Sequence, residues 1–255
     1  LFRSICQSGN CPNISECWGN GTATFMILGD ICTRSCKFCS VKTGKPLRPD
    51  PNEPKKIAQS VKMMNLNHCV ITSVDRDDLP DGGAAIWADT IAAIKKLNPE
   101  TTIETLIPDF QGRKDLLKKI IEQRPEVVSH NLETVKRLTK SIRIQAKYER
   151  SLEVLKILKD AGLVTKSGIM AGIGETDREI YETMDDLSAV SCDVLTIGQY
   201  LQPTPENTSV ERYLNQKDFD NYKKAGLAKG FKIVESGSLV RSSYHAEKHK
   251  NLKNC

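Results

Sequence analysis

Short apolar runs alternate with longer amphipathic stretches from Ala23 to about residue 200. Within the amphipathic stretches apolar residues recur at helical spacing, as at Leu152, Leu155 and Leu158, and Gly162 is a typical helix stop. The apolar runs predict strands at Thr24–Leu28, His68–Val74, Thr102–Ile107, Glu126–His130, Val164–Met170 and Asp193–Ile197. The amphipathic stretches predict helices at Pro54–Met64, Ala84–Leu97, Arg113–Gln123, Leu132–Leu138, Tyr148–Ala161 and Asp177–Leu187.

Strands that alternate with helices predict parallel strands joined by right-handed crossovers. Six such units are present, two fewer than in a closed eightfold barrel. We therefore expect an α/β fold, a partial (β/α)6 TIM-like barrel with N- and C-terminal extensions. The expected parts are an extension over 1–22, the barrel over 23–200 and a C-terminal extension over 201–255, with a helix near Lys217–Lys229 and a strand near Phe231–Val234.

Composition narrows the class of protein. The chain has 255 residues and a net charge of +5 that is spread along its length. Because this charge is mild and spread out, we expect no nucleic-acid partner. The chain has no apolar run of about 18 residues, so we expect no membrane span. Free thiolates need a reducing compartment, so we expect the cytoplasm, or an organelle matrix if a transit peptide preceded Leu1.

Cysteines are the most informative residues of the chain. Six of the nine lie in the first 39 residues. Cys32, Cys36 and Cys39 form a C-x3-C-x2-C motif directly after the first predicted strand, at the end of the barrel where chemistry occurs. Three thiolates at this spacing can hold three irons of a [4Fe–4S] cluster and leave the fourth iron open to a small molecule. A second trio, C-x4-C-x5-C, comprises Cys6, Cys11 and Cys17.

Two other interpretations of the cysteines are possible. Structural zinc prefers four ligands, commonly as two C-x2-C pairs, and neither trio offers two such pairs. A disulfide framework is typical of short secreted chains, whereas this chain has an odd cysteine count and no secretory segment. We therefore favour two iron–sulfur sites.

The motifs of the chain together resemble one known family. They are C-T-R-S-C-K-F-C, T-S-V-D-R-D-D-L-P-D-G-G-A, S-H-N-L-E-T-V, T-K-S-G-I-M-A-G-I-G-E, G-Q-Y-L-Q-P-T and a terminal R-S-S-Y-H-A, after the C-x4-C-x5-C trio. In this order they resemble the lipoyl synthases, a family of the radical S-adenosylmethionine (SAM) superfamily. The resemblance covers nearly the whole chain.

The resemblance implies insertion of two sulfur atoms at C6 and C8 of an octanoyl-lysine on a lipoyl carrier domain. It implies two [4Fe–4S] clusters, and SAM that is cleaved to methionine and 5′-deoxyadenosine. Cys32, Cys36 and Cys39 would hold the catalytic cluster. The auxiliary cluster, which donates the sulfur, would be held by Cys6, Cys11, Cys17 and Ser243, with Ser242 as the alternative ligand.

The resemblance also implies partners. The carrier domains would be 2-oxoacid dehydrogenase E2 subunits or the glycine cleavage H protein, and the electron donor a flavodoxin or ferredoxin. We expect a monomer. The implied cofactor-binding residues are Phe38, Asp75, Asp77, Asp78, Asn131, Glu133, Arg143, Gly172 and Glu175.

Several of these residues also have a purely structural interpretation. Asp75, Asp77 and Asp78 could form a solvated acidic turn, Asn131 could cap a helix, and Gly172 could serve a tight turn. Two other functions compete with the one implied. A biotin-synthase-like enzyme would share the C-x3-C-x2-C motif, but the second trio and the R-S-S-Y tail disfavour it. A two-cluster electron carrier would give each cluster four cysteines.

Overall fold

The structure, a computed structural model, describes residues 11–249 and residue 252. The described chain is an α/β fold with seven main strands, and the strand pairs within its two compact units are parallel. The first unit comprises 1–34, 41–128 and 245–255, and the second comprises 35–40 and 129–244. No helix in the described residues is long and apolar enough to cross a membrane.

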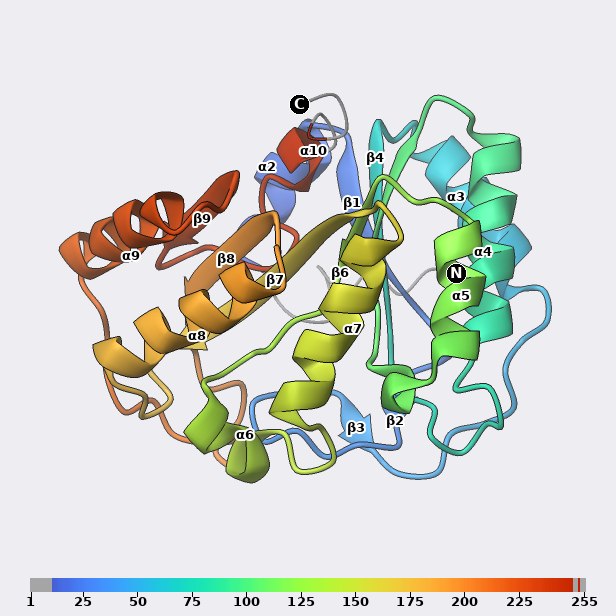
Figure 1. The fold of residues 1–255 in the computed structure, drawn as a ribbon. Helices are drawn as coiled ribbons and strands as arrows, with labels where there is room; N and C mark the ends of the chain where they lie inside the picture. The colour runs from blue at the N-terminus through green and yellow to red at the C-terminus, as the bar shows by residue number, and fades with distance from the viewer. Residues whose placement is uncertain (1–10, 250–251, 253–255) are drawn as a thin grey trace. The chain divides into compact units, whose positions relative to one another are not determined.

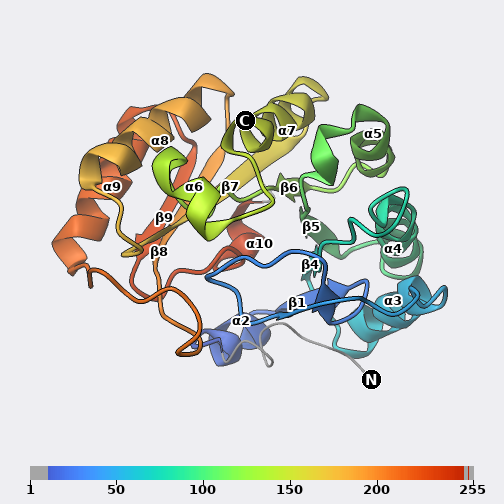
Figure 2. The ribbon, with the colours of Figure 1, turned by 90° about the horizontal axis from the view of Figure 1, so that it is seen from below.

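The first unit is built on three parallel strands in the order β1-β4-β5, with Thr22 opposite His68 and His68 opposite Thr102. Every residue of β1 is buried, as expected for a parallel strand that is covered on both faces. Three helices stand side by side in this unit, with α4 packed between α3 and α5 (Figures 1 and 2). The bounds are β1 Thr22–Ile27, β4 His68–Ser73, β5 Thr102–Leu106, α3 Glu53–Met63, α4 Ala84–Leu97 and α5 Lys114–Glu122.

Shorter elements of the first unit carry the cysteines and the chain end. The two-residue strand β2 (Ile31–Cys32) pairs with β3 (Lys42–Thr43). Helix α2 (Ile14–Gly19) precedes β1, and the 3-10 helix η1 (Phe110–Gly112) follows β5. The C-terminal helix α10 (Ala246–His249) packs against β4.

The second unit repeats the parallel pattern in the order β7-β8-β9. Its core includes Leu155, Ile169, Leu195 and Phe219, all at most 2% exposed. Helix α9 packs against α8 and β9 (Figure 2). The bounds are β7 Val164–Ala171, β8 Val194–Gln199, β9 Ile233–Gly237, α6 Lys136–Ile142, α7 Tyr148–Asp160, α8 Asp177–Ala189 and α9 Gln216–Ala228, while β6 (Val127–Ser129) lies where the chain passes between the units.

The predicted fold class and all six predicted strands are confirmed, with small shifts at their ends. The strand expected near Phe231–Val234 is also present, as β9, and it pairs with β8. One detail differs. The helix expected from Leu132 begins only at Lys136, because Glu133 is still paired with Ile169 in the manner of a strand.

Candidate active site

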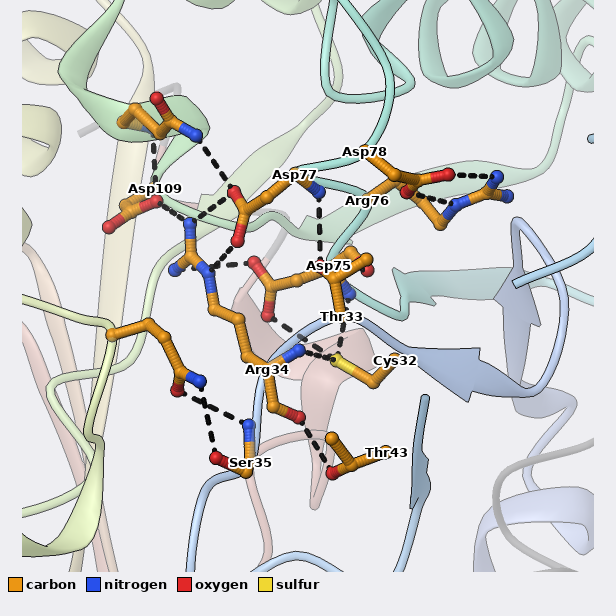
Figure 3. Close-up of polar contacts among 12 residues, drawn as sticks. Cys32, Thr33, Arg34, Ser35, Thr43, Asp75, Arg76, Asp77, Asp78 and Asp109 are labelled. Atoms are coloured by element: carbon orange, nitrogen blue, oxygen red, sulfur yellow. Dashed lines mark hydrogen bonds and ion pairs between the residues drawn. The ribbon is translucent and has the colours of Figure 1, made fainter. Parts of the chain in front are cut away.

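Cys32 lies on β2 in the first unit, and backbone donors surround its sulfur (Figure 3). The N–H groups of Arg34 and Asp75 donate to the Cys32 Sγ at 3.4 and 3.3 Å. Burial raises the pKa of the Cys32 thiol, and the N–H of Arg34 partly offsets this rise. Because such donors stabilise a thiolate, this sulfur is suited to bind iron.

Arg34, two residues after Cys32, makes a buried ion-pair network with three aspartates (Figure 3). Its Nε and Nη2 donate to the two oxygens of Asp77 at 2.7 and 2.9 Å. Its Nη2 also donates to Asp109 at 2.7 Å, and its Nη1 lies 3.3 Å from Asp75. Burial by itself lowers the pKa of Arg34, but the Asp77 hydrogen bond and the charges of Asp75 and Asp109 raise it overall. The guanidinium is therefore a permanent charge.

The other carboxylates after β4 are also paired within the first unit. The Arg76 side chain, which is buried, binds both oxygens of Asp78 at 2.8 and 2.9 Å. This hydrogen bond lowers the pKa of Asp78. The Asp81 carboxylate accepts from the N–H groups of Gly83 and Ala85 at the start of α4. The predicted acidic cluster thus organises its own loop and the Cys32 segment.

Cys36 and Cys39 lie in the segment of the second unit that follows Arg34. The N–H of Cys39 donates to the carbonyl of Cys36 at 3.1 Å, which closes a turn between the two cysteines. Asn207 binds this turn, since its Nδ2 donates to the carbonyls of Lys37 and Cys39, both at 3.1 Å. Phe38 packs against the cluster of Ile142, Ile173 and Tyr200. Phe38 therefore anchors the turn in the second unit.

Asn131, Glu133 and Arg143 are brought together after β6. Asn131 Nδ2 donates to Glu133 Oε1 at 3.1 Å, while the buried Asn131 Oδ1 has no hydrogen-bond partner in the structure. Burial raises the pKa of Glu133, which the charge of Arg143 and the Asn131 hydrogen bond partly offset. Arg143 Nη1 donates to the Leu132 carbonyl at 2.9 Å. The Oδ1 atom is thus a buried acceptor that can receive a donor from a bound molecule.

Gly172 and Glu175 shape the loop after β7. The Glu175 carboxylate accepts from the N–H groups of Gly172 and Ile173 at 2.6 and 2.9 Å. This bidentate contact turns the carboxylate into its own loop. Glu175 therefore holds the loop of Gly172, the other cofactor-binding residue implied after β7.

Parts of the second cysteine site also lie in the first unit. Cys17 is on α2, and Cys11 precedes this helix, while Cys6 lies outside the described residues. His245, two residues after Ser243, contacts the carboxylate of Glu16 at 3.3 Å. Glu247 Oε2 accepts from Thr22 Oγ1 at 3.4 Å. The start of α10 thus lies against Glu16, the residue before Cys17.

Among the described residues, the possible metal ligands are not arranged as in a site for a single ion. In residues 11–249 and 252, no three His, Cys, Asp or Glu side chains gather as they would around one ion. In a cubane cluster each thiolate binds a different iron atom, so its ligands need not converge on one point. In the first unit, the backbone donors to the Cys32 sulfur fit a thiolate ligand of such a cluster. In the second unit, the open acceptor Asn131 Oδ1 fits a bound small molecule with a donor group.

Sequence reasoning missed three residues of this region, namely Arg34, Asp109 and Asn207. Arg34 lies inside the C-T-R-S-C motif, and this position was the one available signal. Asp109 lies 75 residues after its partner Arg34 in the sequence, and Asn207 lies 168 residues after its partner Cys39. No local pattern connects positions so far apart.

A family model described as the radical SAM superfamily matches residues 26–187. At the level of structure, the fold is similar to that of SuiB from Streptococcus suis bound to S-adenosylmethionine, with a TM-score of 0.64 at 14% identity over 91% of this chain and 56% of that one. It is also similar to methylornithine synthase (PylB), with a TM-score of 0.60 at 15% identity over 89% and 75% of the two chains. The chain is a radical SAM enzyme.

Whole-chain relatives narrow this class further. A lipoyl synthase of Bacteroides fragilis is 60% identical over 253 residues, which is 99% of this chain and 88% of the relative. A mitochondrial lipoyl synthase of Nematostella vectensis is 61% identical over 249 residues, or 97% and 86%. This chain belongs to the lipoyl synthase family. The family implies a [4Fe–4S] cluster and SAM as cofactors.

Proposed function

We propose that the chain inserts two sulfur atoms at C6 and C8 of an octanoyl group that is attached to a lysine of a lipoyl carrier domain. The single observation that carries the proposal is the identity of 60% to lipoyl synthases over nearly the whole chain. The C–H bonds at these carbons are unactivated, and no side-chain base has a pKa that could remove such a proton. A radical must therefore break them.

Cys32, Cys36 and Cys39 would hold the catalytic cluster, which supplies an electron for the cleavage of SAM to methionine and a 5′-deoxyadenosyl radical. The N–H groups of Arg34 and Asp75 support the Cys32 thiolate. In the second unit, the buried Asn131 Oδ1 would accept a hydrogen bond from SAM. A Cβ at Gly168 would lie 3.0 Å from this oxygen, so the glycine keeps the amide accessible.

Cys6, Cys11, Cys17 and Ser243 would hold the second cluster, which is consumed as the sulfur-donating substrate. The contacts of His245 with Glu16 and of Glu247 with Thr22 support this role for the tail. A hydroxyl oxygen is a harder and poorer ligand for such an iron than a thiolate. We infer that the serine-bound iron is the first to leave.

The partners follow from this chemistry. The substrates are octanoylated E2 subunits of 2-oxoacid dehydrogenases and the glycine cleavage H protein. The electrons come from a reduced flavodoxin or ferredoxin. The enzyme works as a monomer in the cytoplasm or an organelle matrix.

Two sets of cysteine variants test the proposal. Changing Cys32, Cys36 and Cys39 to Ala is expected to abolish formation of 5′-deoxyadenosine. Changing Cys6, Cys11 and Cys17 to Ala is expected to abolish sulfur insertion and leave reductive cleavage of SAM measurable. Both products are quantified by mass spectrometry after anaerobic reconstitution. Lipoyl product from the second triple variant would refute the assignment of the sulfur donor.

A further inference from the structure

We infer that Arg34 is a positioning residue for the catalytic cluster, because its guanidinium fixes the two peptide N–H groups that hydrogen-bond to the Cys32 sulfur. The inference rests on the proposed assignment of Cys32 as a cluster ligand. The contacts that carry it all lie in the first unit.

The planar guanidinium of Arg34 makes parallel hydrogen bonds through its Nε and Nη2 atoms. Nε and Nη2 bind the two oxygens of Asp77, and Nη2 reaches Asp109 as well. Asp109 is itself fixed by the N–H of Gln111, which donates to its Oδ1 at 3.0 Å. A lysine carries the same charge but cannot reproduce these parallel contacts.

Burying the charges of Arg34 and Asp109 costs free energy unless each charge is paired. The Arg34 side chain is 5% exposed and that of Asp109 is fully buried. A buried ion pair gains little net stability, since the desolvation of both charges offsets their attraction. Arg34 therefore contributes mainly by fixing the geometry of the cysteine loop.

Main-chain hydrogen bonds connect the Arg34 side chain to the environment of the Cys32 sulfur. The Arg34 N–H donates to Cys32 Sγ, and the Arg34 carbonyl accepts from Thr43 Oγ1 at 3.0 Å. The Asp75 carbonyl accepts from the N–H and the hydroxyl of Thr33, at 3.1 and 3.0 Å. The Asp75 N–H is the second donor to the sulfur. The Arg34 side chain binds Asp75 and Asp77, so it holds both segments that supply the donors.

Two measurable consequences follow. Hydrogen bonds to cluster sulfurs influence the reduction potential, and donors favour the more negative, reduced state. Loosening the donors should therefore move the midpoint potential of the cluster to more negative values. Loss of such an outer contact typically weakens metal retention about 10- to 100-fold.

The test uses the full chain with Cys6, Cys11 and Cys17 changed to Ser, so that only the catalytic cluster assembles. In this background, Arg34→Lys preserves the charge and removes the fork. Arg76→Lys is the matched control, because Arg76 is also buried and binds Asp78 in the same loop. Its other contacts are with the carbonyls of Leu28 and Leu47, and not with the residues that donate to the Cys32 sulfur. The midpoint potential is measured by an EPR-monitored titration, and iron loss is followed with a chelator.

Arg34→Lys is expected to lower the midpoint potential and to accelerate iron loss at least tenfold, while Arg76→Lys changes neither. Thr43→Val, a charge-neutral change on β3, is expected to produce a smaller shift of the same sign. Unchanged potential and iron loss in both variants overturn the inference, as does an equal shift in Arg76→Lys. If the parent chain binds no iron, the ligand assignment itself fails, and the inference fails with it.

Discussion

At the scale of single residues, the loop after β7 depends on the absence of a side chain at Gly172. Its φ of +103° is one that L residues rarely adopt. A Cβ there would lie 2.3 Å from the carbonyl oxygen of Arg212. The structural interpretation of this glycine is therefore supported, and the same loop carries the contact between Glu175 and the N–H of Gly172.

We predict that Gly172→Ala destabilises the protein by at least ~3 kcal/mol, through backbone strain and the clash with Arg212. The control is Gly162→Ala, at φ +77° with no atom near its Cβ, which should cost about 1 kcal/mol. Urea unfolding of both variants gives the comparison. Equal losses of unfolding free energy in the two variants would contradict the prediction, because they would show that movement of the loop relieves the clash.

At the scale of elements, helix α8 begins with a reciprocal capping box. The Thr176 side chain accepts from the N–H of Glu179, and the Glu179 carboxylate accepts from the N–H of Thr176. Arg137 adds a bidentate ion pair to the same carboxylate, with contacts of 2.6 and 2.9 Å. The hydrogen bonds from Arg137 and Thr176 lower the pKa of Glu179 from 4.5 to about 2.

This shift predicts an acid-dependent loss of stability. Because the pKa is lower in the folded state, the carboxylate stabilises the fold above pH 4.5, and this contribution is lost as the pH falls towards 2. Glu179→Gln should cost about 1 kcal/mol at neutral pH after solvent screening and flatten the acid dependence. Glu182→Gln, which removes only an i,i+4 contact with Arg178, is the control. Urea unfolding at pH 6 and pH 3 measures both, and a Glu179→Gln variant that retains the full acid dependence would contradict the prediction.

The local elements were predictable, because each depends on a pattern within its own residues. The apolar run at His68–Val74 became β4, and the tail strand differed from β9 by only a few residues. The predicted start of α6 was wrong, because the pairing of Glu133 with Ile169 depends on another strand. Helix α2 was not predicted, since six residues in a polar extension give little periodic signal.

At the scale of the whole molecule, the sequence indicated which residues supply ligands but not what holds them. The C-x3-C-x2-C spacing is a local signal, and it led to the family. The ion pairs of Arg34 and the contact of Asn207 with the Cys39 carbonyl join residues that are distant in the chain. Only the fold reveals such contacts. The return of the tail to Glu16 was predictable because the family resemblance linked the two chain ends.

The central claim is that one cluster cleaves SAM and a second supplies sulfur. The most direct test is anaerobic reconstitution of the full chain, followed by iron and sulfide quantitation and a single turnover on an octanoyl-lysine peptide with dithionite and SAM. We predict about eight irons per chain, 5′-deoxyadenosine and the mass of a dithiolane product. Four irons with 5′-deoxyadenosine but no sulfur transfer would contradict the account.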